Sequence, residues 1–341
     1  MSRVVRLALP VVAALAVGAV LLALSGVSPS EAVGLVWEGA FGSAAKVSDT
    51  LMSWVPLVLA ASGLVVTFTA GLWNIGVEGQ IVAGAIAATW VARSLPGPGW
   101  VVVPAALLAA LAGGVAWALL AGLLRTRGGV NEIFGGLGLD FVAAGLAVYL
   151  ILGPWQRQGV ASTSGTDVFR VQAWLPTLPN LRLSPLAIGI ALAGLIGVGL
   201  LLRGTRPGLR LRAVGGNPAS ALVLGIPTER YLLGAFALCG ALAGLAGAVQ
   251  ATGFHHKLVP AVSGGYGFLG ILVVLLAGFR TVWIGPLALV FVAVAAGGTQ
   301  LQLRLNVDSS LSGVVLGVGV LVALLLGARG AKEAPPLVEE P

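Results

Sequence analysis

The chain is dominated by apolar runs that are long enough to cross a lipid bilayer. Several of them reach the roughly 20 residues that a helix needs to span the hydrocarbon core. Spanning segments must satisfy their own backbone hydrogen bonds, which a helix of this length does. The sequence therefore predicts an all-α polytopic membrane protein with about ten transmembrane helices. The predicted spans are 7–26, 54–70, 76–93, 100–124, 130–152, 185–202, 231–252, 263–279, 283–302 and 310–328.

Composition supports a membrane bundle and argues against a soluble protein. Charged residues make up 9% of the chain, against about 25% in soluble domains. Glycine accounts for 51 of 341 residues, and small residues let transmembrane helices approach one another closely. The net charge of +7 lies in the stretches between spans, so we expect no nucleic-acid partner. Cys239 is the single cysteine, which excludes an intrachain disulfide.

The positive charges predict which side each loop faces. If the first span starts inside, twelve of the 19 Lys and Arg residues fall on the inner side and seven on the outer side. Such an excess marks the cytoplasmic side, so both termini are predicted to be cytoplasmic. Residues 1–330 then form one transmembrane domain with a polar outer loop at 153–183, and residues 331–341 form a disordered cytoplasmic tail. A cleaved signal peptide is the competing interpretation of the basic and apolar N-terminus.

The cytoplasmic interval 203–230 is the most distinctive polar stretch. It carries five arginines and one acid, Glu229. Within it, Asn217 is a good N-cap, Pro218 suits the first helical position and Gly225 suits the C-terminal end. A helix of roughly seven residues, about 10 Å long, is too short to be stable alone. We therefore expect it to be held by the membrane domain or by a protein partner.

Glu78 lies in a polar interruption, GLWNIGVEGQ at residues 71–80, between two apolar runs. This pattern predicts a discontinuous helix or a tight turn whose backbone needs protein or water partners. Glu78 near a helix N-terminus would interact favourably with the helix dipole and the free amides. Direct contact with a substrate is the alternative.

Two further acids belong to the fifth predicted span. Asn131 and Glu132 open this helix as an N-cap and a first-turn acid. Asp140 lies about 12 Å further along and is surrounded by glycines. A charge at this depth is costly and usually faces the bundle interior or a cavity. A role in a substrate pathway and a buried, hydrogen-bonded role both remain open.

Other motifs do not indicate chemistry. Gly265, Gly267 and Gly270 match G-x-G-x-x-G, but the apolar context permits no βαβ unit and favours helix packing. The adjacent His255 and His256 have no acid or thiol cluster beside them, so we expect no metal site. The chain has no phosphate-binding GxxxxGK[ST] loop and no catalytic triad or dyad. We therefore expect neither an enzyme nor a chain that binds ATP itself.

Several stretches resemble bacterial ABC importer permeases for nucleosides and simple sugars, within a branched-chain amino acid permease-like family. GLWNIGVEGQIVAGA (71–85) and LRLRAVGGNPASALVLGI (209–226) resemble its signatures, as do ALAGLAGAVQATGFHHKL (241–258) and GGYGFLGILVVLLAG (264–278). GVNEIFGGLGLDFVA (129–143) is similar to the larger permease of nucleoside-type systems. The resemblance covers about residues 54–328. Where Asp140 stands, the family usually has asparagine.

The resemblance implies a set of partners. Such permeases lie in the bacterial plasma membrane, in contact with lipid, and pair with a second permease as a homodimer or heterodimer. They receive ligand from an extracytoplasmic substrate-binding protein and dock a cytoplasmic ATPase, which holds ATP and Mg²⁺, so this chain needs no cofactor. The ATPase-coupling helix corresponds here to Asn217–Gly225, although an ordinary loop helix is the alternative. The implied coupling residues are Arg212, Gly215, Asn217, Pro218, Ala219, Leu222 and Gly225.

The predicted function is import of a nucleoside or a related nucleobase or sugar compound by alternating access. Such ligands are neutral and polar, so aromatic, amide and a few acidic groups suffice to bind them. The candidate pathway residues are Trp73, Asn74, Glu78, Gln80 and Asp140. A simple-sugar importer of the same architecture is the alternative. A secondary transporter would instead use Asp140 or Glu78 as an ion site, and a membrane enzyme would need a catalytic set that the sequence lacks.

Overall fold

The computed structural model describes residues 28–157 and 164–305, with residues 16–17, 19–20, 23, 313–314 and 317–322 of the flanking segments. These residues are helical and contain no β-strand, as predicted. They fall into two compact units, residues 51–288 and residues 1–50 with 289–341, which we call the bundle unit and the terminal unit. The predicted spans 7–26 and 310–328 lie largely outside the described residues, and the tail 331–341 lies wholly outside them.

The helices follow one another with short connections, apart from the loop between α6 and α7 and residues 255–265 before α11. Their bounds are α2 Pro29–Phe41, α3 Ala44–Thr69, α4 Val77–Ser94, α5 Gly99–Thr126, α6 Glu132–Leu152, α7 Pro185–Gly204, α8 Arg206–Gly216, α9 Pro218–Val223, α10 Thr228–Ala248, α11 Tyr266–Leu276 and α12 Thr281–Leu305. A 3₁₀ turn, η1, covers Val171–Ala173, and α10 continues into a π-helical stretch, η2, at Val249–Phe254.

The expected count of ten spans is not supported. In the described part of the chain, six helices are long and apolar enough to cross a membrane. They are Ala44–Thr69, Gly99–Thr126, Glu132–Leu152, Pro185–Gly204, Thr228–Phe254 and Thr281–Gly298. The run 263–279 forms only the 11-residue α11. The run 76–93 forms α4, which has 18 residues but carries Glu78, Gln80 and Arg93.

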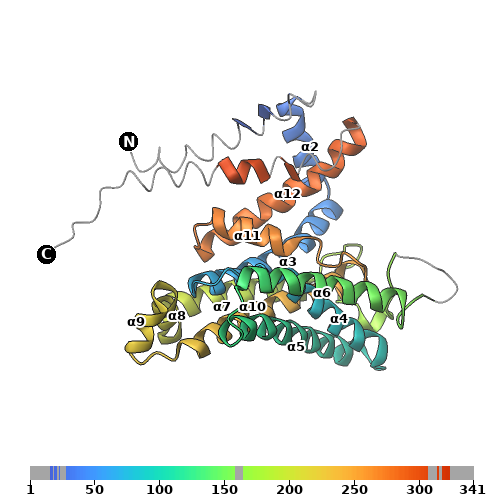
Figure 1. The fold of residues 1–341 in the computed structure, drawn as a ribbon. Helices are drawn as coiled ribbons and strands as arrows, with labels where there is room; N and C mark the ends of the chain where they lie inside the picture. Colours follow the sequence, from blue (N-terminus) through green and yellow to red (C-terminus); the bar gives the residue numbers. More distant parts are fainter. Residues whose placement is uncertain are drawn as a thin grey trace. The chain divides into compact units, whose positions relative to one another are not determined.

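Helix α4 is polar for a spanning helix because it lies inside the bundle. It packs against α5, α10 and α6, and Figure 1 shows these four helices side by side. Most of its residues between Val77 and Ala92 are buried. A helix that is enclosed by other helices does not meet lipid, so its side chains can be polar where a neighbour supplies a partner.

Glycines allow α4, α5 and α10 to pack backbone against backbone. A Cβ atom at Gly114 of α5 would overlap the carbonyl oxygen of Gly240 of α10, and one at Gly247 would overlap the carbonyl oxygen of Ile81 of α4. A Cβ at Gly84 would likewise overlap Gly244. The high glycine content therefore serves close helix packing, as predicted.

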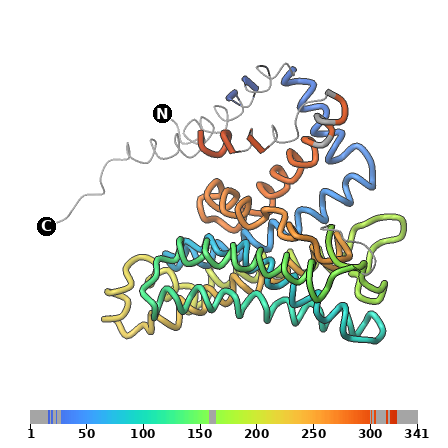
Figure 2. Tube along the Cα trace, turned by 45° about the vertical axis from the view of Figure 1, so that its right-hand side comes forward, coloured from blue at the N-terminus to red at the C-terminus, as the bar shows by residue number. Residues whose placement is uncertain are grey.

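The connections of the bundle unit gather at two opposite ends (Figures 1 and 2). At one end, α8 and α9 lie beside the turn that joins α3 to α4, where a Cβ on Gly71 would contact Gly215. Arg127 and Glu229, which the sequence places on the inner side, form an ion pair there at 2.9 Å. At the other end lies the loop 153–184, where the amide of Phe169 donates to the carbonyl of His256 at 2.8 Å.

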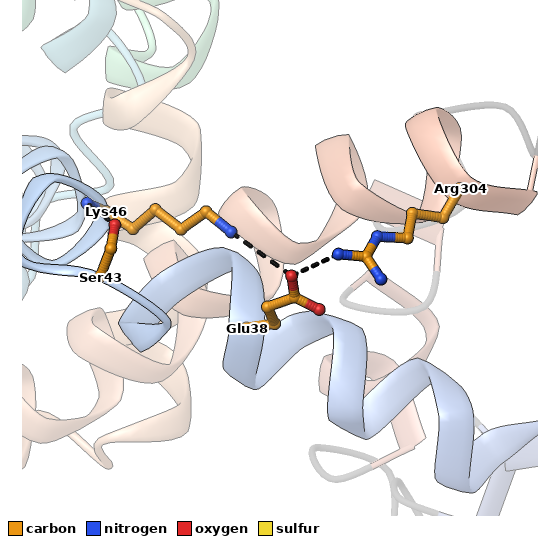
Figure 3. A network of polar contacts seen from close by, with 4 residues as sticks. All are labelled: Glu38, Ser43, Lys46 and Arg304. Carbon is orange, nitrogen blue, oxygen red and sulfur yellow. Dashed lines mark hydrogen bonds and ion pairs between the residues drawn. The ribbon is translucent and has the colours of Figure 1, made fainter.

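The terminal unit contains α2, the first turns of α3 and the last part of α12. Residues 28–53, which lie between the first two predicted spans, include α2, and α3 begins at Ala44 rather than near residue 54. Gly39 of α2 packs closely on Gly297 of α12. Glu38 accepts from Arg304 and lies 3.9 Å from the Lys46 ammonium nitrogen (Figure 3). The sequence places all three of these charges on the outer side.

Candidate functional site

Glu78 links α4 to the start of the half-length helix α11. Its carboxylate oxygens accept hydrogen bonds from the amides of Gly265 at 3.0 Å and Gly267 at 2.7 Å. Gly264 and Gly265 have φ angles of +60° and +74°, a left-handed conformation that glycine adopts readily. The backbone thus turns sharply into α11, and Glu78 satisfies the amides that the first turn leaves free. Glu78 lies in the first turn of its own helix, as predicted, but its carboxylate serves another helix.

The chain before α11 completes a discontinuous segment. The amide of Leu258 bonds to Thr166 at the end of the bundle unit that holds the loop 153–184, whereas Gly265 bonds to Glu78 near the N-terminus of α4. Residues 258–265 therefore run along the bundle without forming a helix. The polar interruption at 71–80 supplies Glu78, which accepts hydrogen bonds from the backbone amides at the end of this non-helical stretch. A discontinuous helix needs such partners for its free backbone groups.

Asp140 is buried between α6 and α4 and bonds to the N-terminal turn of α4. Its side chain is 8% exposed, and its Oδ1 accepts from the amide of Gly79 at 2.7 Å. The buried atoms Oδ2 of Asp140 and Nε1 of Trp117 have no partner among the described residues. A Cβ on Gly79 would lie 2.7 Å from Asp140 Oδ1 and 3.0 Å from Trp117 Nε1. The geometry shows the buried, hydrogen-bonded role, and the pathway role stays a prediction.

Asn74 and Gln80 form a reciprocal amide pair. Gln80 Nε2 donates to Asn74 Oδ1 at 3.1 Å, and Asn74 Nδ2 donates to Gln80 Oε1 at 3.3 Å and to Cys239 Sγ at 3.1 Å. Both side chains are almost fully buried. The side-chain amides therefore bond to other groups of the protein, and they join the α3–α4 turn to α4 and α10.

Trp73 is the exposed member of the predicted pathway set. It is 45% exposed, and its ring centroid lies 5.2 Å from that of Phe68. Phe68 in turn contacts Phe279 edge to face at 5.8 Å. The structure thus brings Glu78, Asp140, Asn74 and Gln80 together around the start of α4, whereas Trp73 contacts Phe68 and is partly exposed. Trp117 joins that group through Gly79, and an isolated tryptophan in an apolar run carries no signal that would have identified it.

The short helix α9 has the bounds that the sequence predicts. Asn217 Oδ1 accepts from the amide of Ser220 at 3.0 Å, and Pro218 is the first helical residue. At the other end, Gly225 has φ +77°. Its amide donates to Leu222 O at 2.9 Å, and the amide of Ile226 donates to Ala221 O at 3.0 Å. This pair of bonds is a Schellman motif, which ends a helix with glycine in the left-handed conformation.

The bundle unit holds α9 through α8, a helix that we did not predict. Thr205 caps α8 by accepting from Gly208, and Arg212 of α8 donates to the carbonyl of Leu202 at the end of α7. A Cβ on Gly215 would overlap the carbonyl oxygen of Thr69, so α8 packs directly on the end of α3. Arg212 and Gly215, which the family resemblance implied as coupling residues, therefore hold α8 against the ends of α7 and α3.

The face of α9 that points away from the bundle is apolar. Ala221 is buried, whereas Leu222, Val223 and Leu224 are 62%, 88% and 77% exposed. Pro218 and Ala219 are exposed as well. These three consecutive aliphatic residues, at the end of α9 and its C-cap, form an exposed apolar patch of the kind found at protein or membrane contacts.

The remaining motifs contribute to packing. Gly270 packs on α3 near Ala61, in line with the predicted packing role of that glycine motif. His256 stacks on Trp174 with centroids 4.0 Å apart, and burial lowers its pKa. The part of the chain that the structure describes holds no cluster of three His, Cys, Asp or Glu residues that could ligate a metal.

Comparisons with known proteins agree on one class. The family model described as branched-chain amino acid transport system / permease component matches residues 46–325. The glucose ABC transporter permease protein TsgB13 of Haloferax volcanii is 33% identical over 92% of this chain and 85% of its own length. The guanosine ABC transporter permease protein NupP of Bacillus subtilis is 28% identical over 94% of this chain and 93% of its own length. The nucleoside ABC transporter permease protein NupB of Lactococcus lactis is 28% identical over 82% of this chain and 79% of its own length.

Proposed function

The chain belongs to the family of permease components of branched-chain amino acid transport systems, and from this premise we propose that it imports a nucleoside or a related nucleobase or sugar compound. It is a multi-pass membrane permease subunit of an ABC transporter and not an enzyme. The observation that carries the nucleoside proposal is the guanosine permease relative, which aligns over 94% of this chain and 93% of its own length.

The proposed partners follow from the transporter class. A separate ATPase supplies the energy, a substrate-binding protein delivers the ligand, and a second permease subunit, identical or related, completes the pathway. ATP and Mg²⁺ bind to the ATPase, in keeping with the lack of a phosphate-binding loop in this sequence. We place α8 and α9 in the cytoplasm because they carry the arginine-rich interval 203–230. The proposed cytoplasmic placement of both termini rests on the charge distribution of the sequence alone.

Motion can pass from the ATPase into the bundle through rigid contacts. The exposed face of α9 receives the ATPase, and α8 carries the displacement to the α3–α4 turn, where Gly215 lies directly on Thr69. The turn is fastened to α4 by the Asn74–Gln80 pair, and α4 is fastened to α11 by Glu78. A contiguous series of packed, hydrogen-bonded elements is what such coupling needs. ATP binding favours one state of the pathway because the ATP-bound form of the ATPase binds that state of the permease more tightly than the other.

A simple sugar is the second candidate for the transported compound. The glucose permease of Haloferax volcanii is 33% identical to this chain over most of both lengths. Sugars and nucleosides are both neutral and polar, so the same few amide and aromatic groups serve either ligand. A secondary transporter is less well supported, since the two acids that it would use as ion sites bond to backbone amides.

Docking of the ATPase can be tested with one substitution at each end of the bundle unit. Val223→Glu places a charge on the exposed face of α9, and Val168→Glu makes the same change at an exposed position of the outer loop. The ATPase, co-expressed and purified through a tag on the permease, should be lost from Val223→Glu and retained by Val168→Glu. Retention of the ATPase by Val223→Glu, or uptake that continues without any ATPase, would refute this docking site.

The transported compound can be identified through the binding protein of the same system. Thermal-shift measurements with guanosine, adenosine, guanine, ribose and glucose should show stabilisation by the nucleosides. Uptake of radiolabelled guanosine by cells with and without the permease then tests transport itself. Stabilisation by glucose alone would favour the sugar importer and leave the ATPase-docking result unaffected.

A further inference from the structure

An apolar groove opens at the α8–α9 end of the bundle unit, beside the contacts that anchor α8. It has a volume of about 400 Å³ and lies between the ends of α3 and α7, the start of α8 and the first turns of α10. Val66, Leu201, Leu211 and Leu238 are among its walls. Gly234 faces it with open space, since a Cβ added there would meet no atom within 4 Å.

The mouth of the groove is positively charged. Arg230 and Tyr231 line it, and Arg210 donates to the Tyr231 hydroxyl at 3.4 Å, which holds a second guanidinium at the same place. Neither arginine is paired with a carboxylate within the described ranges. The neighbouring acid, Glu229, is 2.9 Å from Arg127 of α5. The charge at the mouth is therefore available to an anion.

We propose that this groove binds an anionic phospholipid, with its phosphate at Arg230 and Arg210 and an acyl chain along α10 between α3 and α7. From Arg230 to Leu238 the helix rises about 12 Å, which is close to the roughly 15 Å depth of one leaflet of the hydrocarbon core. An apolar channel that starts at an arginine pair matches a molecule with a charged head and an aliphatic tail. A free phosphate would leave the apolar walls uncovered, and a protein segment would have no reason to be negatively charged at this depth.

The bound lipid would stabilise the element that carries α9. The groove is bordered by α8 on one side and by the transmembrane helices on the other, so a lipid lying in it contacts both. This inference rests on the proposed cytoplasmic placement of residues 203–230, because basic pockets on that side select anionic headgroups. Labelling of an Arg212→Cys variant in intact cells tests that placement separately from lipid binding.

Lipid binding is measured on the purified full chain in detergent by native mass spectrometry. Phosphatidylglycerol and phosphatidylcholine with identical acyl chains are the two probes. The wild type should bind phosphatidylglycerol more tightly. Each arginine near a membrane surface contributes about 1 kcal/mol, so Arg230→Gln should weaken phosphatidylglycerol binding about fivefold. It should weaken phosphatidylcholine binding less, because the choline cation offsets the phosphate charge. Arg157→Gln, on the outer loop, is the matched control and should change neither affinity.

The apolar part of the site is tested with a filling substitution. Gly234→Leu should reduce binding of both lipids, whereas Gly189→Leu, which also points into open space but lies on α7 away from the groove, should reduce neither. Equal affinity of the wild type for the two lipids, or unchanged phosphatidylglycerol binding in Arg230→Gln, would overturn the proposal. These outcomes do not depend on the ATPase or on the transported compound, so they are separable from a failure of the proposed function. Arg230→Gln alters an exposed side chain and decides the matter even if Gly234→Leu does not fold.

Discussion

The Glu78 carboxylate accepts a hydrogen bond from the amide of Gly267 at 2.7 Å, across 189 positions of sequence. This contact joins the first turn of α4 to the first turn of α11 and lets a half-length helix begin inside the bundle. Without it, the free amides of α11 would have no partner in an environment from which water is largely excluded. The contact therefore couples the stability of α11 to the residue that interrupts the apolar pattern at 71–80.

Loss of this cap should destabilise the protein. Glu78→Ala leaves the amides of Gly265 and Gly267 without an acceptor, at a cost of about 1–3 kcal/mol. Glu78→Gln retains one carbonyl oxygen as an acceptor, so its loss of folding free energy should be roughly half that of Glu78→Ala. Thermal unfolding in detergent, followed by tryptophan fluorescence, measures both changes. Glu31→Gln, at an exposed first-turn acid of α2, is the control, and an equal effect of Glu31→Gln and Glu78→Ala would contradict the capping role.

Two glycines of α10 should respond oppositely to the same substitution. Gly244→Ala places a Cβ against the backbone of Ala110 and Gly114 of α5, and overpacking of this kind costs about 1–3 kcal/mol. Gly234→Ala meets open space and should be neutral or stabilising by up to about 1 kcal/mol through helix propensity. Melting temperatures of the two variants provide the comparison. Similar values for both would mean that α5 and α10 are not in backbone contact.

Asp140→Asn separates a structural role from a role in transport. The asparagine carbonyl can still accept from Gly79, and the change removes a buried carboxyl oxygen that has no partner in the described structure. We expect the melting temperature to stay the same or to rise, and guanosine uptake to persist. Asp140→Leu should cost about 1–3 kcal/mol because the Gly79 amide loses its acceptor. Loss of uptake by a stably folded Asp140→Asn variant would instead show that the charge serves transport.

The caps of α9 should control affinity for the ATPase rather than global stability. Asn217→Ala removes the N-cap, which is worth about 1 kcal/mol, and Gly225→Ala forces alanine to φ +77° at about 1–2 kcal/mol. Since α9 must be ordered to bind, each change should weaken ATPase binding about fivefold or more. Gly216→Ala, with open space and no positive φ, is the control. A binding assay with purified subunits that shows equal affinities would contradict this account.

Acid should weaken the contact between the outer loop and the end of α10. Burial lowers the pKa of both His255 and His256 from the ordinary value of 6.5, and the nearby Lys257 lowers that of His255 further. Below pH 6.5 the unfolded chain binds protons that the folded chain does not, so stability falls as the pH falls. Well above that value neither state of the chain binds these protons, and the contribution of the two histidines to the pH dependence fades. The melting temperature should therefore drop between pH 7.5 and 5.5.

The matched variant for this pH effect keeps the ring contact with Trp174. His256→Phe preserves stacking on the indole without a titrating group, and His255→Gln removes the second one. The double variant should show a shallower decrease in melting temperature over the same pH range. An unchanged decrease would show that other groups are responsible.

Local signals in the sequence identified those elements whose ends are determined by neighbouring residues. Asn217, Pro218 and Gly225 predicted α9 correctly because capping and turn bonds join residues within about five positions of each other. Six spans were recognised because length and hydropathy are properties of a single segment. Helix α8 was missed although Thr205 caps it, since its arginines hid the pattern of buried Leu211 and Val214.

The sequence by itself determined that the chain is a helical membrane protein with a capped, arginine-flanked helix outside the apolar segments, because hydropathy, length and capping are local. Only the tertiary structure decided what the polar residues of the bundle do. Glu78 bonds to α11, Asp140 bonds to Gly79, and Asn74 bonds to Gln80 and Cys239. Three of these four contacts bridge segments far apart in the chain, and which amide a buried acid reaches depends on how closely glycines allow the helices to approach.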